Sequence, residues 1–99
     1  MNKLNLIIVN SAERDMLSIA DYIAKHNKKA ANQLLKEFYN SFNLFCIHPK
    51  VGFKRKDFTY KNVRFYVVKK NYLIVYTVIG NTVQILRVLS AYQDICSIL

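Results

Sequence analysis

The sequence predicts one α+β domain of order β-α-α-β-β-β, in which a helical hairpin packs on one face of an antiparallel meander sheet. The prediction rests on the spacing of apolar residues, which alternate with polar ones at residues 3–9, recur every three or four residues at 11–47, and alternate again at 63–89. The chain has 99 residues, of which 53% are hydrophobic. Residues 1–99 therefore suffice for one core and not for a second lobe.

The first strand is predicted at residues 3–9, where the alternating pattern becomes continuously aliphatic, which favours a central position in the sheet. The first helix is expected to begin at about residue 11, with Asn10 as its N-cap and Glu13 reaching back to it, and to end near residues 26–29. Its buried stripe has three- and four-residue spacing and is widened by two further apolar residues: Ala12, Met16, Ile19, Ala20 and Ile23, with Leu17 and Ala24.

The second helix is predicted from about Lys29 to Ile47, and the short connection makes the two helices an antiparallel hairpin. It ends before Pro49, because proline disfavours helix at the preceding residue and has no amide hydrogen. The segment 50–60 has no period, contains Gly52 and is expected to form a surface loop. The apolar stripe of the second helix holds Leu34, Leu35, Phe38, Phe42 and Phe45, flanked by Ala31 and Cys46.

Three meander strands are predicted in the remaining chain from β-branched and aromatic residues, at 63–67, 72–79 and 82–89. The first turn between them is Lys69-Lys70-Asn71, and the second is the two-residue hairpin signal Gly80-Asn81. Lys69 and Lys70 are therefore interpreted as a hairpin tip and not as a site. The tail after the last strand has the length of one short helix carrying Ile95, Ile98 and Leu99.

The net charge of +9 is concentrated in one part of the chain. Residues 50–70 hold eight Lys or Arg and one Asp, an excess of seven positive charges. Such a segment suggests an anionic partner, and composition alone leaves nucleic acid, an acidic protein and a membrane surface open.

Several classes of function are disfavoured by what the sequence lacks. It has no Gly-rich phosphate loop and no His, Cys or carboxylate pattern at metal-ligand spacing, so we expect no cofactor and no metal. Cys46 and Cys96 are interpreted as reduced packing residues, and His26 and His48 as solvated or capping residues. The apolar runs are too short for a signal peptide or a membrane span, which predicts a cytoplasmic protein without a membrane partner.

The basic segment is the main candidate site. Lysines and arginines stand there beside aromatic residues, a combination that phosphate contact and base stacking require. The alternative is a solvated loop that Phe53 and Phe58 anchor to the core. The cations are Lys50, Lys54, Arg55, Lys56 and Lys61 of the loop and Arg64 of the following strand, with Phe53, Phe58 and Tyr60 among them.

Arg87 is a second candidate because it is in phase with the apolar residues Val83 and Ile85 of the last strand. Unless the register slips, its side chain is predicted to point toward the apolar side of the sheet or into a cleft at the end of the sheet, where a guanidinium needs a partner. That partner is an acidic residue of a helix or an external anion. Tyr92, just past the strand, either faces the same cleft or caps the core.

Nearly the whole chain resembles the RelE/ParE superfamily of toxins from bacterial toxin–antitoxin modules. Individually weak patterns carry the resemblance through their order and spacing over about 80 residues. They are Ala12-Glu13-Arg14-Asp15, Ile19, Asp21-Tyr22-Ile23, Ala30-Ala31, His48-Pro49-Lys50-Val51-Gly52, Val63-Arg64, Tyr72-Leu73-Ile74-Val75-Tyr76, Ile85-Leu86-Arg87-Val88-Leu89 and Gln93-Asp94.

The RelE-like branch implies a ribosome-dependent mRNA endoribonuclease that uses loop lysines, an arginine on the third strand and a basic or His residue after the last strand. Here Leu73 stands at the position of the strand arginine, and Ser90-Ala91-Tyr92 replaces the usual exit from the last strand. Both departures disfavour the nuclease. If the chain is one, its candidate catalytic residues are Lys54, Lys56, Arg64, Arg87 and Tyr92.

The ParE-like branch implies inhibition of DNA gyrase by binding, which needs a charged surface and no acid–base residues. The paired long helices, the Pro-x-x-Gly turn and the Arg-Val-Leu ending resemble this branch more closely, so it is the favoured hypothesis. The third hypothesis is a remnant that is inactive or that only binds antitoxin or nucleic acid. The resemblance also implies a cognate antitoxin whose acidic C-terminal segment folds across the toxin. Candidate residues for binding target or antitoxin are Lys50, Lys54, Arg55, Lys56, Arg64, Arg87 and Tyr92.

Overall fold

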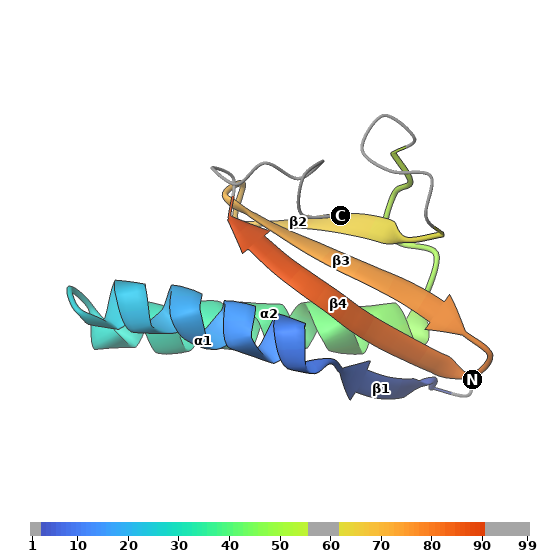
Figure 1. Cartoon of the computed structure of the whole chain (residues 1–99), viewed down its shortest axis with the longest axis horizontal. Helices are drawn as coiled ribbons and strands as arrows, with labels where there is room; N and C mark the ends of the chain where they lie inside the picture. The colour runs from blue at the N-terminus through green and yellow to red at the C-terminus, as the bar shows by residue number, and fades with distance from the viewer. Residues whose placement is uncertain (1–2, 56–61, 91–99) are drawn as a thin grey trace.

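The computed structural model describes residues 3–55 and 62–90, and it confirms the order β-α-α-β-β-β. Figure 1 shows two long helices side by side, covering one face of a twisted sheet. The elements are β1 (Asn5–Ile8), α1 (Asn10–Ala24), α2 (Lys28–Ile47), β2 (Arg64–Val68), β3 (Tyr72–Ile79) and β4 (Thr82–Ser90). The expected short helix of the tail lies outside the described residues.

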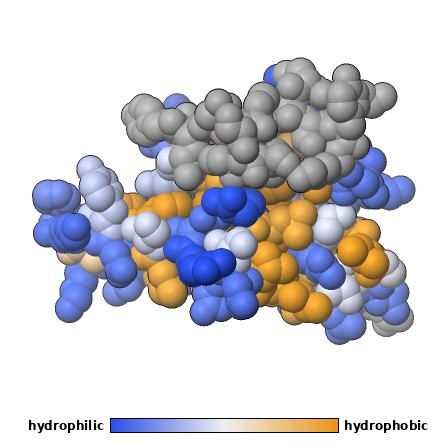
Figure 2. All heavy atoms as spheres, in the orientation of Figure 1, coloured by the Kyte–Doolittle hydropathy of each residue, from blue (hydrophilic) through white to orange (hydrophobic). Residues whose placement is uncertain are grey.

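The sheet has the strand order β1-β4-β3-β2. Strands β2, β3 and β4 form the predicted antiparallel meander, while β1 pairs with β4 in parallel, Asn5 opposite Thr82 and Ile8 opposite Ile85. The central position predicted for the first strand is therefore wrong, because β1 is an edge strand. The aliphatic residues of β1 lie in two different surroundings. Ile8 packs against the core, whereas the side chain of Ile7 is 48% exposed. Figure 2 shows apolar surface in this region of the molecule.

The helices bury the predicted faces, with one exception. Ala12, Met16 and Ala20 of α1 are buried as expected, but Leu17 is 52% exposed. The predicted cap at Asn10 is also wrong, since α1 already includes Asn10 and Val9 stands at the N-cap without a side-chain hydrogen bond. The cap that forms belongs to α2, where the side chain of Asn27 accepts a hydrogen bond from the amide of Ala30 at 3.0 Å.

Both faces of the sheet carry buried side chains. The larger cluster lies between helices and sheet, where the rings of Phe45 from α2 and Tyr76 from β3 stack with centroids 4.0 Å apart. The predicted packing role of Cys46 is confirmed, since this free cysteine is 1% exposed and belongs to the same cluster; Cys96 lies outside the described residues. The smaller cluster is built from Val63, Phe65, Leu73, Val75 and Leu89.

No helix in the described part of the chain is long and apolar enough to cross a membrane. Within residues 3–55 and 62–90, no three His, Cys, Asp or Glu side chains gather as metal ligands do.

Candidate functional site

The turn after α2 is held by a tyrosine from the middle of the sheet. The Tyr76 hydroxyl donates a hydrogen bond to the carbonyl oxygen of Pro49 at 2.9 Å and accepts one from the amide of Gly52 at 2.8 Å. A Cβ atom on Gly52 would lie 2.6 Å from that hydroxyl oxygen and 2.9 Å from the carbonyl oxygen of Phe65, so only glycine fits here. Burial raises the pKa of Tyr76, while the hydrogen bond from Gly52 and the charge of Arg64 oppose the rise.

Two further contacts fix the same turn to β2. The Arg64 Nη1 atom donates to the carbonyl oxygen of Gly52 at 2.8 Å. Phe53 and Phe65 exchange backbone hydrogen bonds of 2.9 and 2.7 Å, and their rings lie 5.9 Å apart. Phe53 thus anchors the start of the loop, as the solvated-loop alternative predicted, although its side chain remains 40% exposed.

A small pocket of about 240 Å³ opens between this turn and the end of the sheet. Three of its lining residues are cations, and its described lining has no acidic side chain; we call it the basic pocket. Lys54 Nζ donates to the side-chain oxygen of Asn62 at 3.2 Å. The lining residues are Pro49, Lys50, Lys54, Asn62, Arg64, Thr77 and Val78.

The structure thus brings together three of the predicted site residues, Lys50, Lys54 and Arg64. Arg55 is exposed and does not line the pocket. Lys56 and Tyr92 lie outside the described residues, as do Phe58, Tyr60 and Lys61. The predicted hairpin tip at Lys69 and Lys70 is confirmed, since both are exposed and join β2 to β3.

Arg87 lies elsewhere and has an internal partner. Its Nε and Nη2 atoms donate to the two carboxylate oxygens of Asp15 on α1, at 2.7 and 3.0 Å, which confirms the helix-borne acid as its partner. The hydrogen bond to Asp15 raises the pKa of Arg87, so the guanidinium stays charged.

The phase predicted for Arg87 is wrong because β4 contains a bulge. Ile85 pairs with Tyr76 and Arg87 with Val75, so Leu86 is the extra residue. After the bulge it is Val88, not Arg87, that joins the helix-facing cluster with Val83 and Ile85.

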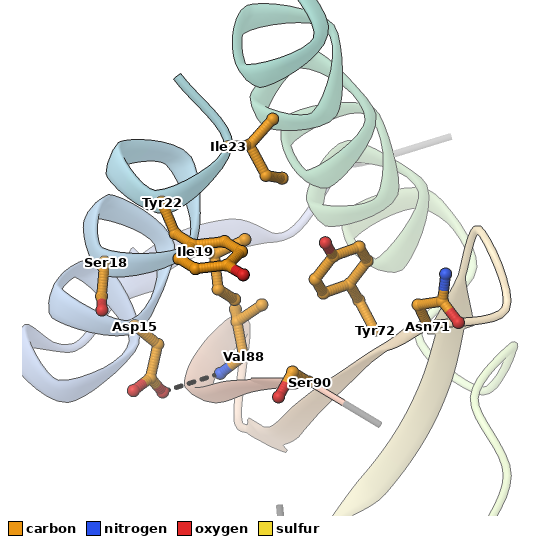
Figure 3. A pocket seen from close by; sticks show the side chains of 9 residues that line it. All are labelled: Asp15, Ser18, Ile19, Tyr22, Ile23, Asn71, Tyr72, Val88 and Ser90. Atoms are coloured by element: carbon orange, nitrogen blue, oxygen red, sulfur yellow. Dashed lines mark hydrogen bonds between the residues drawn. The ribbon is translucent and has the colours of Figure 1, made fainter. Parts of the chain in front are cut away.

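A second pocket, of about 480 Å³, lies between α1 and the end of the sheet where β3 begins and β4 ends. None of its lining residues is among the predicted site residues. Figure 3 shows Tyr22 and Tyr72 on opposite sides of it, with Val88 and Ser90 below them. The carboxylate of Asp15 accepts a hydrogen bond from the amide of Val88 at 3.0 Å there, drawn dashed in Figure 3. Its lining is Asp15, Ser18, Ile19, Tyr22, Ile23, Asn71, Tyr72, Val88 and Ser90.

Sequence reasoning also missed Tyr76, whose hydroxyl organises the basic pocket. Tyr76 stands in a run of apolar residues and looks like ordinary core. A signal was present, however, because a buried tyrosine hydroxyl needs a hydrogen-bond partner and a Pro-x-x-Gly turn exposes backbone groups.

In chemical terms, the basic pocket can neutralise and orient an anionic group. Leu73, at the position where the resemblance to RelE-like enzymes calls for an arginine, is 8% exposed and packs in the smaller cluster.

Comparison with one solved structure agrees with this fold. In the chromosomal ParDE toxin–antitoxin system from P. aeruginosa, one chain matches with a TM-score of 0.74 and 19% identity, over 89% of this chain and 96% of that chain. A conserved hypothetical protein from Helicobacter pylori matches with a TM-score of 0.47 and 18% identity, over 88% of this chain and 93% of that one. No curated protein matches the sequence significantly.

Comparison of the sequence with a family model agrees with the structural match to the ParDE system. The model that describes the ParE toxin of the type II toxin–antitoxin system parDE matches residues 6–95. This match spans most of the described helices and strands, including the turn that forms the basic pocket. The chain therefore belongs to the ParE family of toxins from type II toxin–antitoxin systems.

Proposed function

We propose that this ParE-type toxin inhibits DNA gyrase by binding and that a cognate antitoxin with an acidic C-terminal segment neutralises it. The observation that carries the proposal is the basic pocket, in which three cations converge at the end of a rigid sheet. Binding inhibition needs such a charged, shaped surface and no proton-transfer groups. Because gyrase acts on the chromosome, the proposal places the toxin in the cytoplasm.

The same surroundings favour binding over RNA cleavage. A nuclease of the RelE-like kind needs a cation on the third strand beside the scissile phosphate, and Leu73 instead packs in the smaller cluster. The pocket cations stabilise negative charge, but a 2′-hydroxyl also has to lose a proton during RNA cleavage. Lys50, Lys54 and Arg64 are therefore assigned to recognition.

The antitoxin part of the proposal rests on charge complementarity. A disordered acidic segment that folds on binding buries apolar side chains and at the same time pairs its carboxylates with exposed cations. Lys50, Lys54 and Arg55 are all exposed on the loop that flanks the pocket. We expect one antitoxin segment to bind one toxin.

Supercoiling assays with purified toxin and gyrase test the target. We expect relaxed plasmid to remain relaxed at micromolar toxin, and addition of the antitoxin to restore supercoiling. Undisturbed supercoiling at that concentration would sink the proposal. Primer extension on mRNA from expressing cells tests the nuclease alternative, because only a nuclease leaves new 5′ ends within codons.

Charge reversal tests the antitoxin interface. Reversal of Lys54, Arg55 and Lys56 to Glu should weaken antitoxin binding by at least tenfold at low salt. The matched control reverses Lys69 and Lys70 at the hairpin tip and should leave the affinity within about twofold. Equal affinity of the first variant and the unchanged toxin contradicts the electrostatic part of the proposal.

A further inference from the structure

We propose that the basic pocket binds a backbone phosphate of DNA, so that the toxin contacts the DNA held by gyrase as well as the enzyme itself. The inference rests on the proposed gyrase target and adds the chemical class of the ligand. It follows from the free hydrogen-bond donors of the pocket, from the rigidity of its frame, and from the number of cations around it.

The donors of the pocket are only partly used within the protein. Arg64 donates through Nη1 to the carbonyl oxygens of Gly52 and Lys50, at 2.8 and 3.5 Å, and among the described residues its Nε and Nη2 atoms donate to none. Lys50 Nζ has no partner in that part of the chain either. Lys54 gives one hydrogen bond to Asn62 and keeps two N–H groups. An anion entering the pocket therefore meets donors from three residues that have no partner within the described part of the chain.

The frame that carries these donors is fixed before any ligand arrives. Tyr76 bonds the backbone on both sides of Lys50, at Pro49 and at Gly52. The Arg64 guanidinium is held by the Gly52 carbonyl, and the backbone of Phe53 pairs with that of Phe65. A preorganised site spends little of its binding energy on ordering side chains and loop, so even a single small anionic group can bind there.

The arrangement suits a phosphate better than a carboxylate. Lys50 and Lys54 come from the loop and Arg64 from β2, so the donors approach from two sides of a volume of about 240 Å³. A phosphodiester has two charged oxygen atoms, as a carboxylate has, but its tetrahedral phosphorus also carries two ester oxygen atoms outside their plane. Three positive charges also exceed what one carboxylate neutralises, while a DNA strand carries one negative charge about every 3.4 Å along its axis.

Binding of full-length toxin to a fluorescently labelled 20-base-pair duplex, measured by anisotropy over a series of salt concentrations, tests the inference. We expect the affinity to fall steeply with salt, as counterion release requires. Lys50→Gln and Lys54→Gln should each weaken binding at low salt by about tenfold and reduce the slope of log K against log salt by about 0.9. Thermal unfolding of each variant verifies that the fold is intact.

The hairpin-tip lysines provide the matched control, because they carry the same charge in the same half of the chain but do not line the pocket. Lys69→Gln and Lys70→Gln should change affinity by less than about twofold and leave the slope unchanged. An equal effect of all four substitutions would mean that only net charge matters, and it would overturn the pocket as the phosphate site. Pocket variants that lose antitoxin binding but keep DNA binding would also overturn the pocket as the phosphate site.

A parallel supercoiling assay separates this inference from the proposed function. Toxin that inhibits gyrase equally well with and without the pocket substitutions retains the proposed function and refutes the phosphate contact. Toxin that binds the duplex through the pocket but leaves gyrase active retains the phosphate contact and refutes the proposed target. We expect the unchanged toxin and Lys69→Gln to inhibit gyrase equally and Lys54→Gln to inhibit it about tenfold less. This result supports both the gyrase target and the phosphate contact.

Discussion

The hydroxyl of Tyr76 lies 2.8 Å from the amide nitrogen of Gly52, a residue 24 positions earlier in the chain. This contact joins the middle of the sheet to the turn after α2 and fixes the backbone that presents Lys50. The ring of Tyr76 stacks on Phe45, so the hydroxyl is itself held in place by the core. The geometry of the basic pocket therefore depends on one buried polar atom.

Replacement of Tyr76 by Phe should keep the stacked ring and remove both hydrogen bonds. We expect the free energy of unfolding to fall by about 2 kcal/mol, because the Gly52 amide and the Pro49 carbonyl lose a buried partner. Chemical denaturation at neutral pH measures the loss, and Tyr22→Phe, at a ring that is 69% exposed, is the matched control. A variant as stable as the control contradicts the role of the hydroxyl.

Comparison of the unchanged protein with Tyr76→Phe also tests how the free energy of unfolding depends on alkaline pH. Burial raises the pKa of Tyr76 in the folded state above the value of about 10 in the unfolded chain. The folded state then keeps its proton where the unfolded state loses it, so the contribution of Tyr76 is complete below pH 10 and declines as the pH rises toward the folded pKa. The stability difference between the unchanged protein and Tyr76→Phe should shrink above about pH 10. A constant difference up to pH 11 would argue against the raised pKa.

Gly52→Ala tests the close approach of Gly52 to Tyr76 by changing the turn instead of the tyrosine. Its new methyl group would overlap the Tyr76 hydroxyl and the Phe65 carbonyl, so the turn has to move away from the sheet. We expect a loss of about 1–3 kcal/mol in stability, as for other overpacked sites. Loss of DNA affinity should accompany it, because Lys50 and the Arg64–Gly52 contact move with the turn. Unchanged stability and affinity would show that the turn has room to adapt.

The helices and the meander were predictable because local patterns determine them. Helix α2 combines a regular apolar stripe with a proline stop, and Lys69-Lys70-Asn71 and Gly80-Asn81 mark both hairpin turns. The position of β1 was not predictable from its own residues, because pairing with β4 depends on a strand more than 70 residues away. Arg87 was given the wrong phase because a single extra residue, Leu86, reverses the alternation without leaving a pattern in the sequence.

The candidate site was predictable in composition but not in geometry. The loop lysines and Arg64 stand out as charge, whereas the atom that organises them belongs to Tyr76, an apparently ordinary core residue. Long-range hydrogen bonds of this kind depend on how the sheet meets the turn, which is a property of the folded chain.

Both hairpin turns of the meander favour glycine, so adding glycine at one turn and removing it at the other should change stability in opposite directions. Lys70 has a φ of 66°, in the left-handed region that costs a residue with a side chain about 1 kcal/mol, and Gly80 has a φ of 58° with open space around it. Lys70→Gly should therefore raise the free energy of unfolding by about 0.5–1 kcal/mol, and Gly80→Ala should lower it by about 1 kcal/mol. Thermal unfolding resolves both, since 1 kcal/mol corresponds to about 4–8 °C in a domain of this size. Shifts of the same sign would contradict the turn geometry.

A double-mutant cycle on Asp15 and Arg87 tests whether this ion pair fixes α1 against β4. The side chains are only 16% and 29% exposed and form two hydrogen bonds, so we expect a coupling energy of about 1–2 kcal/mol between Asp15→Asn and Arg87→Met. Arg14→Met replaces an exposed arginine next to Asp15 in the sequence and should show coupling below about 0.3 kcal/mol. Equal coupling in both cycles would mean that Asp15 responds to positive charge in general. A larger value for Arg87 alone would show that paired geometry, and not charge, joins the first helix to the bulged end of the last strand.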